Sequence, residues 1–167
     1  MESIRSFAPI AHPSAHILIL GSIPSIASLE ASQYYAHPRN VFWPIMGKIF
    51  NFEASSSYQV RQNALKSAGV AVWDVLQTCV RIGSLDSSIQ AGSRIPNDFS
   101  TFFKHHPHIR LIAFNGSEAE RYFQKTVMTK LDLNGVKFLK LPSTSPAHTI
   151  PFNEKLAAWQ AIKTVKT

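Results

Sequence analysis

One short segment contains phenol, imidazole, guanidinium and amide side chains close together in the sequence. It is Tyr34-Tyr-Ala-His-Pro-Arg-Asn-Val-Phe-Trp43. The segment contains no acidic residue, so it offers stacking surfaces and hydrogen-bonding groups to a ligand. Either Tyr34 or Tyr35 could stack on a planar ligand such as a base, or pack as a core tyrosine with a bonded hydroxyl. Asn40 could cap the helix that follows, or present its amide to a substrate or a water.

Polar turns follow three of four short apolar runs in the chain. They are Gly21–Ser25 after His16–Leu20, Asn115–Ser117 after Arg110–Phe114, and Pro142–His148 after Val136–Leu141. The nearly continuous apolar character of these runs is typical of strands buried on both faces of a parallel sheet. The carboxyl ends of parallel strands meet at one edge, where open α/β sheets bind their ligands. Small hydroxyl residues and helix N-termini gathered there predict an anion-binding floor.

Candidate acids and bases are scarce in these segments. Asp74 follows the fourth apolar run, Val70–Trp73, and could cap the next segment or pair with Arg81. Asp86 and Asp98 lie in the loops beyond. The cluster His105, His106 and His108 has neither the spacing of a helical histidine pair nor that of a zinc finger, so no metal site is expected.

Helical patterns lie between the four predicted strands. They cover Phe42–Phe50, Gln59–Ala68 with Gly69 beyond its end, Asn97–Phe103, Ser117–Lys125 and Asn153–Lys163. Strands alternating with helices indicate right-handed βαβ units with helices on both faces of the sheet. The fold class is therefore α/β, a three-layer α/β/α sandwich around a mainly parallel four-stranded sheet. Residues 1–167 are expected to form one domain, with Gly83–Asp98 as a mobile lid or binding loop.

The overall composition narrows the class of protein. Seventeen Lys and Arg residues stand against ten Asp and Glu, giving a net charge of +7. Such an excess suggests a polyanionic partner such as nucleic acid or an acidic membrane surface. A single cysteine, Cys79, excludes an internal disulfide and fits a reducing cytosol, and we expect it to be packed and inert. The sequence predicts neither a secretory signal nor an apolar stretch long enough to cross a bilayer.

Four motifs together resemble the uracil-DNA glycosylase superfamily, and most closely its hypoxanthine (deoxyinosine) branch, family 6. The motifs are Leu18–Ser25, Tyr34–Trp43, Phe114–Gly116 and Leu141–Ala147. Val72–Leu76, Arg81, Gly83–Asp86 and Pro96–Phe99 are also similar to that branch. The resemblance covers most of the chain, from about Leu18 to Trp159. It implies a base-excision repair enzyme that flips a damaged deoxynucleotide out of double-stranded DNA and hydrolyses its N-glycosidic bond.

The resemblance also implies a role for each motif. Gly21, Ser22, Ile23, Pro24 and Ser25 would form the pocket floor near the sugar and water, and Tyr35 would stack on the flipped base. Asn40 would serve catalysis, and Asn115 would contact the base edge. The second motif, with Ser143, Thr144, Ser145 and Pro146, would pinch the DNA backbone. Apart from the resemblance, we expect electrostatic binding of DNA phosphates, to which Arg39 and Arg94 could contribute. No metal and no cofactor is implied, and the partner is damaged DNA rather than a membrane.

This chain departs from many superfamily members at two positions. The first motif has Ser22 and Ile23 where others carry Asp or Asn, and the second motif begins at Leu141 where others carry His. Both departures argue against efficient uracil excision and are consistent with the deoxyinosine branch. No lysine occupies a motif position, so we expect a monofunctional glycosylase, acting as a monomer in the cytoplasm of a bacterial or archaeal type of cell.

Three other functions remain open at this point. The first is a uracil or mixed deaminated-base glycosylase, which differs in substrate range. The second is a DNA-binding module that kept the fold and lost catalysis. The third, a nucleotide or phosphorylated-metabolite site, lacks the P-loop and the Gly-rich dinucleotide fingerprint.

Overall fold

A four-stranded parallel sheet forms the centre of the protein. The computed structural model describes residues 3–165, and the sheet order is β3-β2-β6-β7, with every neighbouring pair parallel. The strands are β2 (Ile17–Gly21), β3 (Val70–Asp74), β6 (Leu111–Asn115) and β7 (Lys137–Leu141). Each lies within one residue of a predicted strand at either end, which confirms the predicted sheet.

The β7 strand differs from the prediction that all four strands are buried on both faces. β2 and β3 are buried at every residue, whereas in β7 only Leu141 is buried. β7 is an edge strand, so its outer residues face solvent, and Phe138 is 38% exposed. Lys137 and Lys140 occur in this strand, and charged residues at an edge discourage pairing with another chain.

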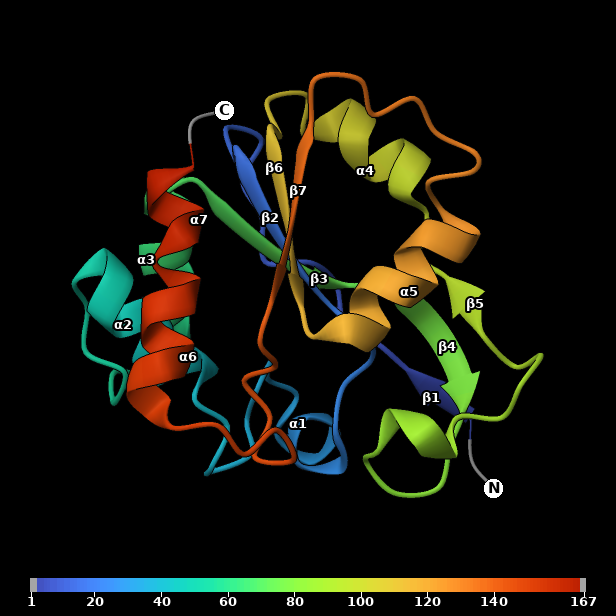
Figure 1. The fold of residues 1–167 in the computed structure, drawn as a ribbon, viewed down its shortest axis with the longest axis horizontal. Coiled ribbons are helices and arrows are strands. Elements are labelled where there is room, and N and C mark those ends of the chain that lie inside the picture. Colours follow the sequence, from blue (N-terminus) through green and yellow to red (C-terminus); the bar gives the residue numbers. More distant parts are fainter. Residues whose placement is uncertain (1–2, 166–167) are drawn as a thin grey trace.

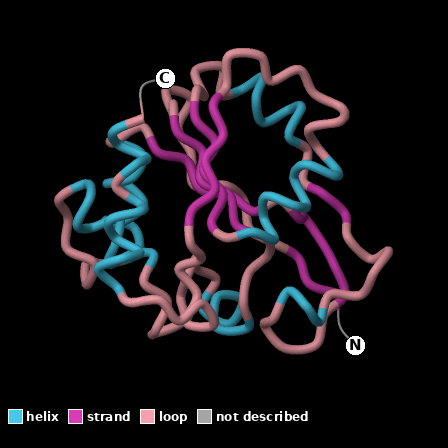
Figure 2. Tube along the Cα trace, viewed as in Figure 1, coloured by secondary structure: helices cyan, strands magenta, loops and turns pink. Residues whose placement is uncertain are grey.

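Helices cover both faces of the sheet, as the fold class predicted. In Figure 1, α2 (Phe42–Phe50), α3 (Tyr58–Ser67), α6 (Phe152–Trp159) and α7 (Ala161–Thr164) lie on one side of the strands. The opposite side carries α4 (Phe99–His105) and α5 (Ser117–Thr126). In Figure 2 the strands of the central sheet form one layer between the two groups of helices. The helix α1 (Ile26–Ala31) lies at the lower edge of the molecule in Figure 1.

Several helix boundaries differ from the sequence prediction. The chain end forms two helices, α6 and α7, divided at Gln160, instead of one helix over Asn153–Lys163. α4 begins at Phe99 because the Asp98 side chain accepts a hydrogen bond from the Thr101 N–H and so caps the helix. The short helix α1 was not predicted, although Ser25 is a favourable cap residue and accepts from the Ser28 N–H.

A second sheet was also not predicted. β1 (Ser3–Arg5), β4 (Leu76–Val80) and β5 (Ile95–Pro96) form an antiparallel sheet in the order β1-β4-β5. Two of these strands are only two or three residues long, too short for a pattern of hydrophobicity to reveal them. The segment expected to be a loop, Gly83–Asp98, thus contains β5 and a short 3-10 helix, η1 (Asp86–Ser88).

Two further predictions from the sequence concern the cysteine and the length of the apolar stretches. Cys79 is unpaired and buried, as expected for a packed thiol. Within residues 3–165, no helix has the length and apolar character that crossing a membrane requires.

Candidate active site

The strand ends and their loops enclose a pocket of about 340 Å³. Register pairs Gly21 with Asp74 and Asn115 with Leu141, so all four strands end at the same edge. A pocket of this volume lies within the ~300–1,000 Å³ typical of small-molecule sites. The predicted site residues that line it are Gly21, Ser22, Ile23, Pro24, Ser25, Tyr35, Asn40, Asn115, Ser143, Thr144 and Ser145. Arg39 and Pro146 are the two predicted residues outside this lining.

The pocket floor is closed by an approach that only glycine allows. A Cβ atom added to Gly21 would lie 2.6 Å from Asp74 Oδ1 and 2.8 Å from the Tyr35 hydroxyl. Both distances are shorter than van der Waals contact, and both neighbours are buried. Gly21 therefore lets a carboxyl and a phenol side chain meet at the end of β2.

Replacement of Gly21 with alanine is expected to lower the free energy of unfolding by ~1–3 kcal/mol, because two buried groups must move. Urea denaturation followed by circular dichroism measures the effect. The same replacement in a Tyr35→Phe background provides the control, since the missing hydroxyl leaves more room and the cost should be smaller. Equal costs in both backgrounds would show that the Tyr35 contact does not matter.

The two adjacent tyrosines have different surroundings. The Tyr34 ring is buried in the core, and its hydroxyl donates to the backbone carbonyls of Phe7 and Ala8. The Tyr35 ring stacks on Phe42, with centroids 4.1 Å apart, and its buried hydroxyl has no hydrogen-bond partner among the described residues. Burial first, and then the charge of Asp74, raises the pKa of Tyr35, while the nearby Asn115 side chain opposes the rise. Tyr34 is thus a core tyrosine, and Tyr35 presents a neutral phenol to the pocket.

The backbone of Tyr35 is strained, with φ at +55° in the left-handed region. A residue with a bulky side chain is uncommon there, at a cost of roughly 1–2 kcal/mol. Strain of this kind concentrates at functional sites.

Asn40 supports the helix that follows it, which is the first of the two interpretations left open by the sequence. Its Oδ1 atom accepts a hydrogen bond from the Phe42 N–H at 3.0 Å, which supports the first turn of α2 although Val41 occupies the formal cap position. The Phe42 N–H needs an acceptor, so the amide oxygen must face the backbone. The NH₂ group of Asn40 has no partner among the described residues and remains available in the pocket.

Asn115 and the second motif hold each other in place. The Asn115 amide donates to Thr144 Oγ1 at 3.0 Å and accepts from the Thr144 N–H at 2.9 Å. Thr144 is buried, and its carbonyl accepts from the Val41 N–H. Both ends of the Asn115 amide are thus engaged, which leaves one N–H and one lone pair for a ligand.

The second motif is also anchored from the C-terminal helix. Lys155 Nζ donates to the Ser145 carbonyl at 3.1 Å, and Trp159 Nε1 donates to the Pro142 carbonyl at 2.9 Å. Both donors lie on α6, and Lys155 and Trp159 are buried. α6 therefore fixes the main chain of the motif at two points.

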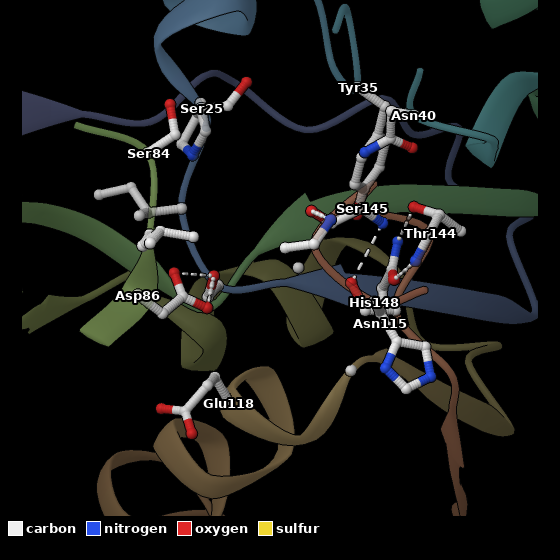
Figure 3. A pocket seen from close by; sticks show the side chains of 18 of the residues that line it. Ser25, Tyr35, Asn40, Ser84, Asp86, Asn115, Glu118, Thr144, Ser145 and His148 are labelled. Carbon is white, nitrogen blue, oxygen red and sulfur yellow. Dashed lines mark hydrogen bonds between the residues drawn. The ribbon is translucent and has the colours of Figure 1, made fainter. Parts of the chain in front are cut away.

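Three carboxyl side chains, those of Asp74, Asp86 and Glu118, line the pocket, which argues against the predicted anion-binding floor. Asp74 ends β3, and Asp86 arrives from η1 and accepts from Ser22 Oγ at 2.9 and 2.8 Å. The sequence indicated Asp74 and Asp86 only as residues after a strand and in a loop. No local pattern shows that η1 folds back 64 residues onto Ser22. Figure 3 shows Asp86 on one side of the pocket, facing Tyr35, Asn40 and Asn115 on the other.

Arginines near the pocket have different roles. Arg81 is buried, and its Nη2 atom donates to the Pro24 carbonyl at 2.6 Å. An Asp74–Arg81 ion pair, one of the two alternatives for Asp74, is absent among residues 3–165, although the positive charge of Arg81 opposes the rise in the pKa of both Asp74 and Asp86. Arg94, the other arginine considered for phosphate binding, lies over the Tyr122 ring at 4.8 Å. Arg39 remains exposed beside the pocket segment.

The described residues contain no group of three or more His, Cys, Asp or Glu side chains that could hold a metal ion. The side chains that line the pocket supply carboxyl, amide, phenol and hydroxyl groups and the imidazole of His148.

Comparison with known proteins decides the family of this chain. The profile of the Uracil DNA glycosylase superfamily matches residues 9–163. The chain belongs to the uracil DNA glycosylase superfamily. The superfamily match includes every strand of the parallel sheet and every residue of the pocket lining.

Relatives within the superfamily cover almost the whole chain. A hypoxanthine DNA glycosylase of Methanosarcina acetivorans is 33% identical over 159 residues, which are 95% of this chain and 96% of the relative. A hypoxanthine DNA glycosylase of Methanosarcina barkeri is 36% identical over 119 residues, covering 71% and 74%. The solution structure of a candidate uracil DNA glycosylase from M. acetivorans superimposes with a TM-score of 0.81 at 31% identity, covering 96% of each chain. The resemblance expected from the motifs is confirmed.

Proposed function

We propose that this protein is a hypoxanthine DNA glycosylase, which flips deoxyinosine out of double-stranded DNA and hydrolyses its N-glycosidic bond to leave an abasic site. The observation that carries the proposal is the pocket at the sheet edge. It combines the first motif, Tyr35, Asn40, Asn115 and the second motif in a superfamily whose two cited relatives are named for this activity.

The pocket suits a flipped nucleoside better than a phosphate group. The negative charge of Asp86 would repel an anion placed in the pocket. A neutral base can enter to the floor, where the ring of Tyr35, backed by Phe42, offers a stacking surface. The DNA phosphates then stay at the mouth, near the hydroxyl groups of Ser143 and Ser145 and the exposed Arg39.

Bond cleavage separates positive charge on the sugar from negative charge on the base. In our proposal the free NH₂ group of Asn40 donates to the leaving base, while its oxygen keeps the bond to Phe42 N–H. We also propose that backbone N–H groups of the Gly21–Ser25 turn stabilise the developing negative charge. We propose that the enzyme is a monofunctional glycosylase, because the pocket lining contains no lysine that could form a Schiff base.

DNA binding in this proposal is electrostatic and depends on salt. The net charge of +7 favours contact with phosphates, so log K should fall linearly with log salt concentration. We expect Arg39→Ala to reduce the slope of that line by about 1 while leaving the preference among bases unchanged. Fluorescence anisotropy with a labelled duplex at several salt concentrations measures both slopes. Equal slopes for the two proteins would remove Arg39 from the interface.

Excision from labelled duplexes carrying one deoxyinosine, uracil or xanthine tests the proposed activity. After incubation, alkali cleaves abasic sites, and chromatography identifies the released base. Cleavage at deoxyinosine with release of free hypoxanthine is the expected result. Faster release of uracil would favour a uracil or mixed glycosylase. Salt-sensitive binding with no release of any base would indicate a non-catalytic DNA-binding module. We further propose a monomer acting beside the chromosomal DNA in the cytoplasm.

A further inference from the structure

The floor of the pocket contains a carboxyl group without a hydrogen-bond donor. Asp74 is 3% exposed at the end of β3, and its Oδ2 atom is buried with no partner. No described residue donates to Oδ1, which lies against Gly21. Buried polar atoms in native proteins nearly always have a partner. A pocket-lining carboxyl without one is therefore placed to bond with a ligand.

A second carboxyl group lies nearer the mouth of the pocket. Asp86 is only partly buried, on η1, and both of its oxygens are within 2.9 Å of Ser22 Oγ. Ser22 has one hydroxyl proton, so it serves one oxygen at a time. The remaining lone pairs of Asp86 have no donor among the described residues.

The two carboxyl groups differ in their protonation. Burial first, and then the negative charge of Asp86, raises the pKa of Asp74 to about 8, against an opposing effect of Arg81. Burial also raises the pKa of Asp86, but the hydrogen bond from Ser22 and the charge of Arg81 favour its ionised form. When the surroundings of two carboxyl groups give them different pKa values, one group can act as the acid and the other as the base.

We propose that Asp74 and Asp86 are the acid–base pair of the excision reaction, with Asp74 donating to the departing base and Asp86 receiving the proton of the attacking water. This inference rests on the proposed function. The first motif itself contains no carboxylate. In the proposed pair Asp86 provides one, because it reaches Ser22 of that motif from a distant segment.

The depth of each carboxyl assigns its role. The flipped base is the planar, least charged part of the nucleotide, so it enters to the floor beside Asp74 and Tyr35. The sugar is attached to the backbone and stays nearer the mouth. Asp86 lies there on its loop, where its negative charge stabilises a cationic sugar.

The reaction balances with these two groups. The C1′–N9 bond breaks, and its electron pair leaves with the purine, which takes the Asp74 proton at a ring nitrogen. Water forms the new C1′–O bond and gives one proton to Asp86. The products are neutral hypoxanthine and an abasic sugar, and solvent returns a proton from Asp86 to Asp74. One water is consumed, and no other reactant is needed.

Other charged and titratable groups near the pair also influence the pKa values of Asp74 and Asp86. Those that act on Asp74 are Asp86, Arg81, Tyr34, Tyr35 and Tyr58. Those that act on Asp86 are Arg81, Glu118, Arg121, Asp74, Cys79 and Tyr122. Burial raises the pKa of each of these tyrosines and of Cys79, so they stay neutral across the neutral range.

Single-turnover excision from a deoxyinosine duplex, measured between pH 5 and pH 9.5, tests the pair. We expect Asp86→Asn to lower the rate constant about 100-fold. Its affinity for an uncleavable 2′-fluoro-deoxyinosine duplex should be unchanged or higher. We expect the wild-type rate to decline above about pH 8, and this decline to be missing in Asp74→Asn. Asp98→Asn, on the exposed cap of α4, is the matched control with wild-type kinetics.

Ser22→Ala separates a chemical role of Asp86 from a structural one. The variant keeps the carboxylate but removes the hydrogen bond that favours its ionised form. The acidic limb of the pH profile should therefore move to higher pH, a change that mere loss of loop packing does not produce. This variant also tests the pair if Asp86→Asn fails to fold.

Several results would overturn the pair. They are a wild-type rate constant in folded Asp86→Asn, a flat wild-type pH profile, or an alkaline decline that persists in Asp74→Asn. If the wild-type protein excises hypoxanthine and the Asp74→Asn and Asp86→Asn variants are equally active, the acid–base pair is rejected but the proposed function stands. Wild-type protein that releases no base from deoxyinosine, uracil or xanthine would reject both.

Discussion

Replacing Asn40 with alanine is expected to lower the single-turnover rate of deoxyinosine excision by ~10²–10³-fold, the usual effect of removing one donor that stabilises developing negative charge. The NH₂ group of Asn40 is the part of the side chain without a partner, and it lines the pocket. Excision at enzyme excess, with abasic sites cleaved by alkali, measures the rate constant. Full activity in Asn40→Ala would reject the proposed role.

A second substitution separates chemistry from folding at the same position. Asn40→Ala also removes the acceptor for the Phe42 N–H, which should lower the free energy of unfolding by ~1 kcal/mol. Asn40→Asp keeps an acceptor there but loses the NH₂ donor, so it should retain stability and still lose activity. Asn63→Ala, on an exposed position of α3, should change neither quantity appreciably.

Replacing Asp74 with asparagine is expected to make the protein more stable than wild type near pH 8. Burial raises the pKa of Asp74 from 3.8 to about 8, so the folded state holds a proton that the unfolded state releases between these values. Wild-type stability contributed by this group is therefore complete below about pH 4 and is lost as the pH rises toward 8. One pKa unit corresponds to ~1.36 kcal/mol, so a rise from 3.8 to about 8 gives a difference on the order of 5 kcal/mol at pH 8.

Urea denaturation at pH 5 and at pH 8 measures this difference. The advantage of Asp74→Asn should be small at pH 5 and should grow at pH 8. Asp98→Asn serves as the control, because Asp98 is exposed and hydrogen bonds from Thr101 lower its pKa, which gives no loss of stability in this range. Parallel pH profiles for wild type and Asp74→Asn would show that Asp74 does not hold a proton in the folded state.

The sequence predicted the sheet and the lining of the pocket because both depend on local patterns. Continuous apolar runs such as Leu111–Phe114 identify buried strands, and parallel pairing then places their polar turns at one edge. It failed where structure depends on distant contacts. The pairing of β1 with β4 joins Ser3 to Val80, and Asp86 reaches Ser22 across 64 residues. Neither contact leaves a periodic signal in either segment.

The exposure of β7 and the pKa of Asp74 could not be predicted from the sequence for a similar reason. Lys137 and Phe138 share an apolar-looking run that a central strand could also have, and only the sheet order shows that β7 lies at an edge. Asp74 was visible as an acid after a strand. Its raised pKa, however, comes from burial and from the charge of Asp86, and both depend on distant segments of the chain meeting.

The attachment of the second motif to α6 has a consequence for synthesis of the protein. Lys155 and Trp159 hold the carbonyls of Ser145 and Pro142, yet they are made after every strand of the central sheet. Chains emerge from the ribosome N-terminus first, at about 5–20 residues per second. A nascent chain can therefore pair β7 with β6 before its second motif is anchored. Until Trp159 has emerged and docked, a partly made molecule lacks the ordered loop that we propose grips DNA.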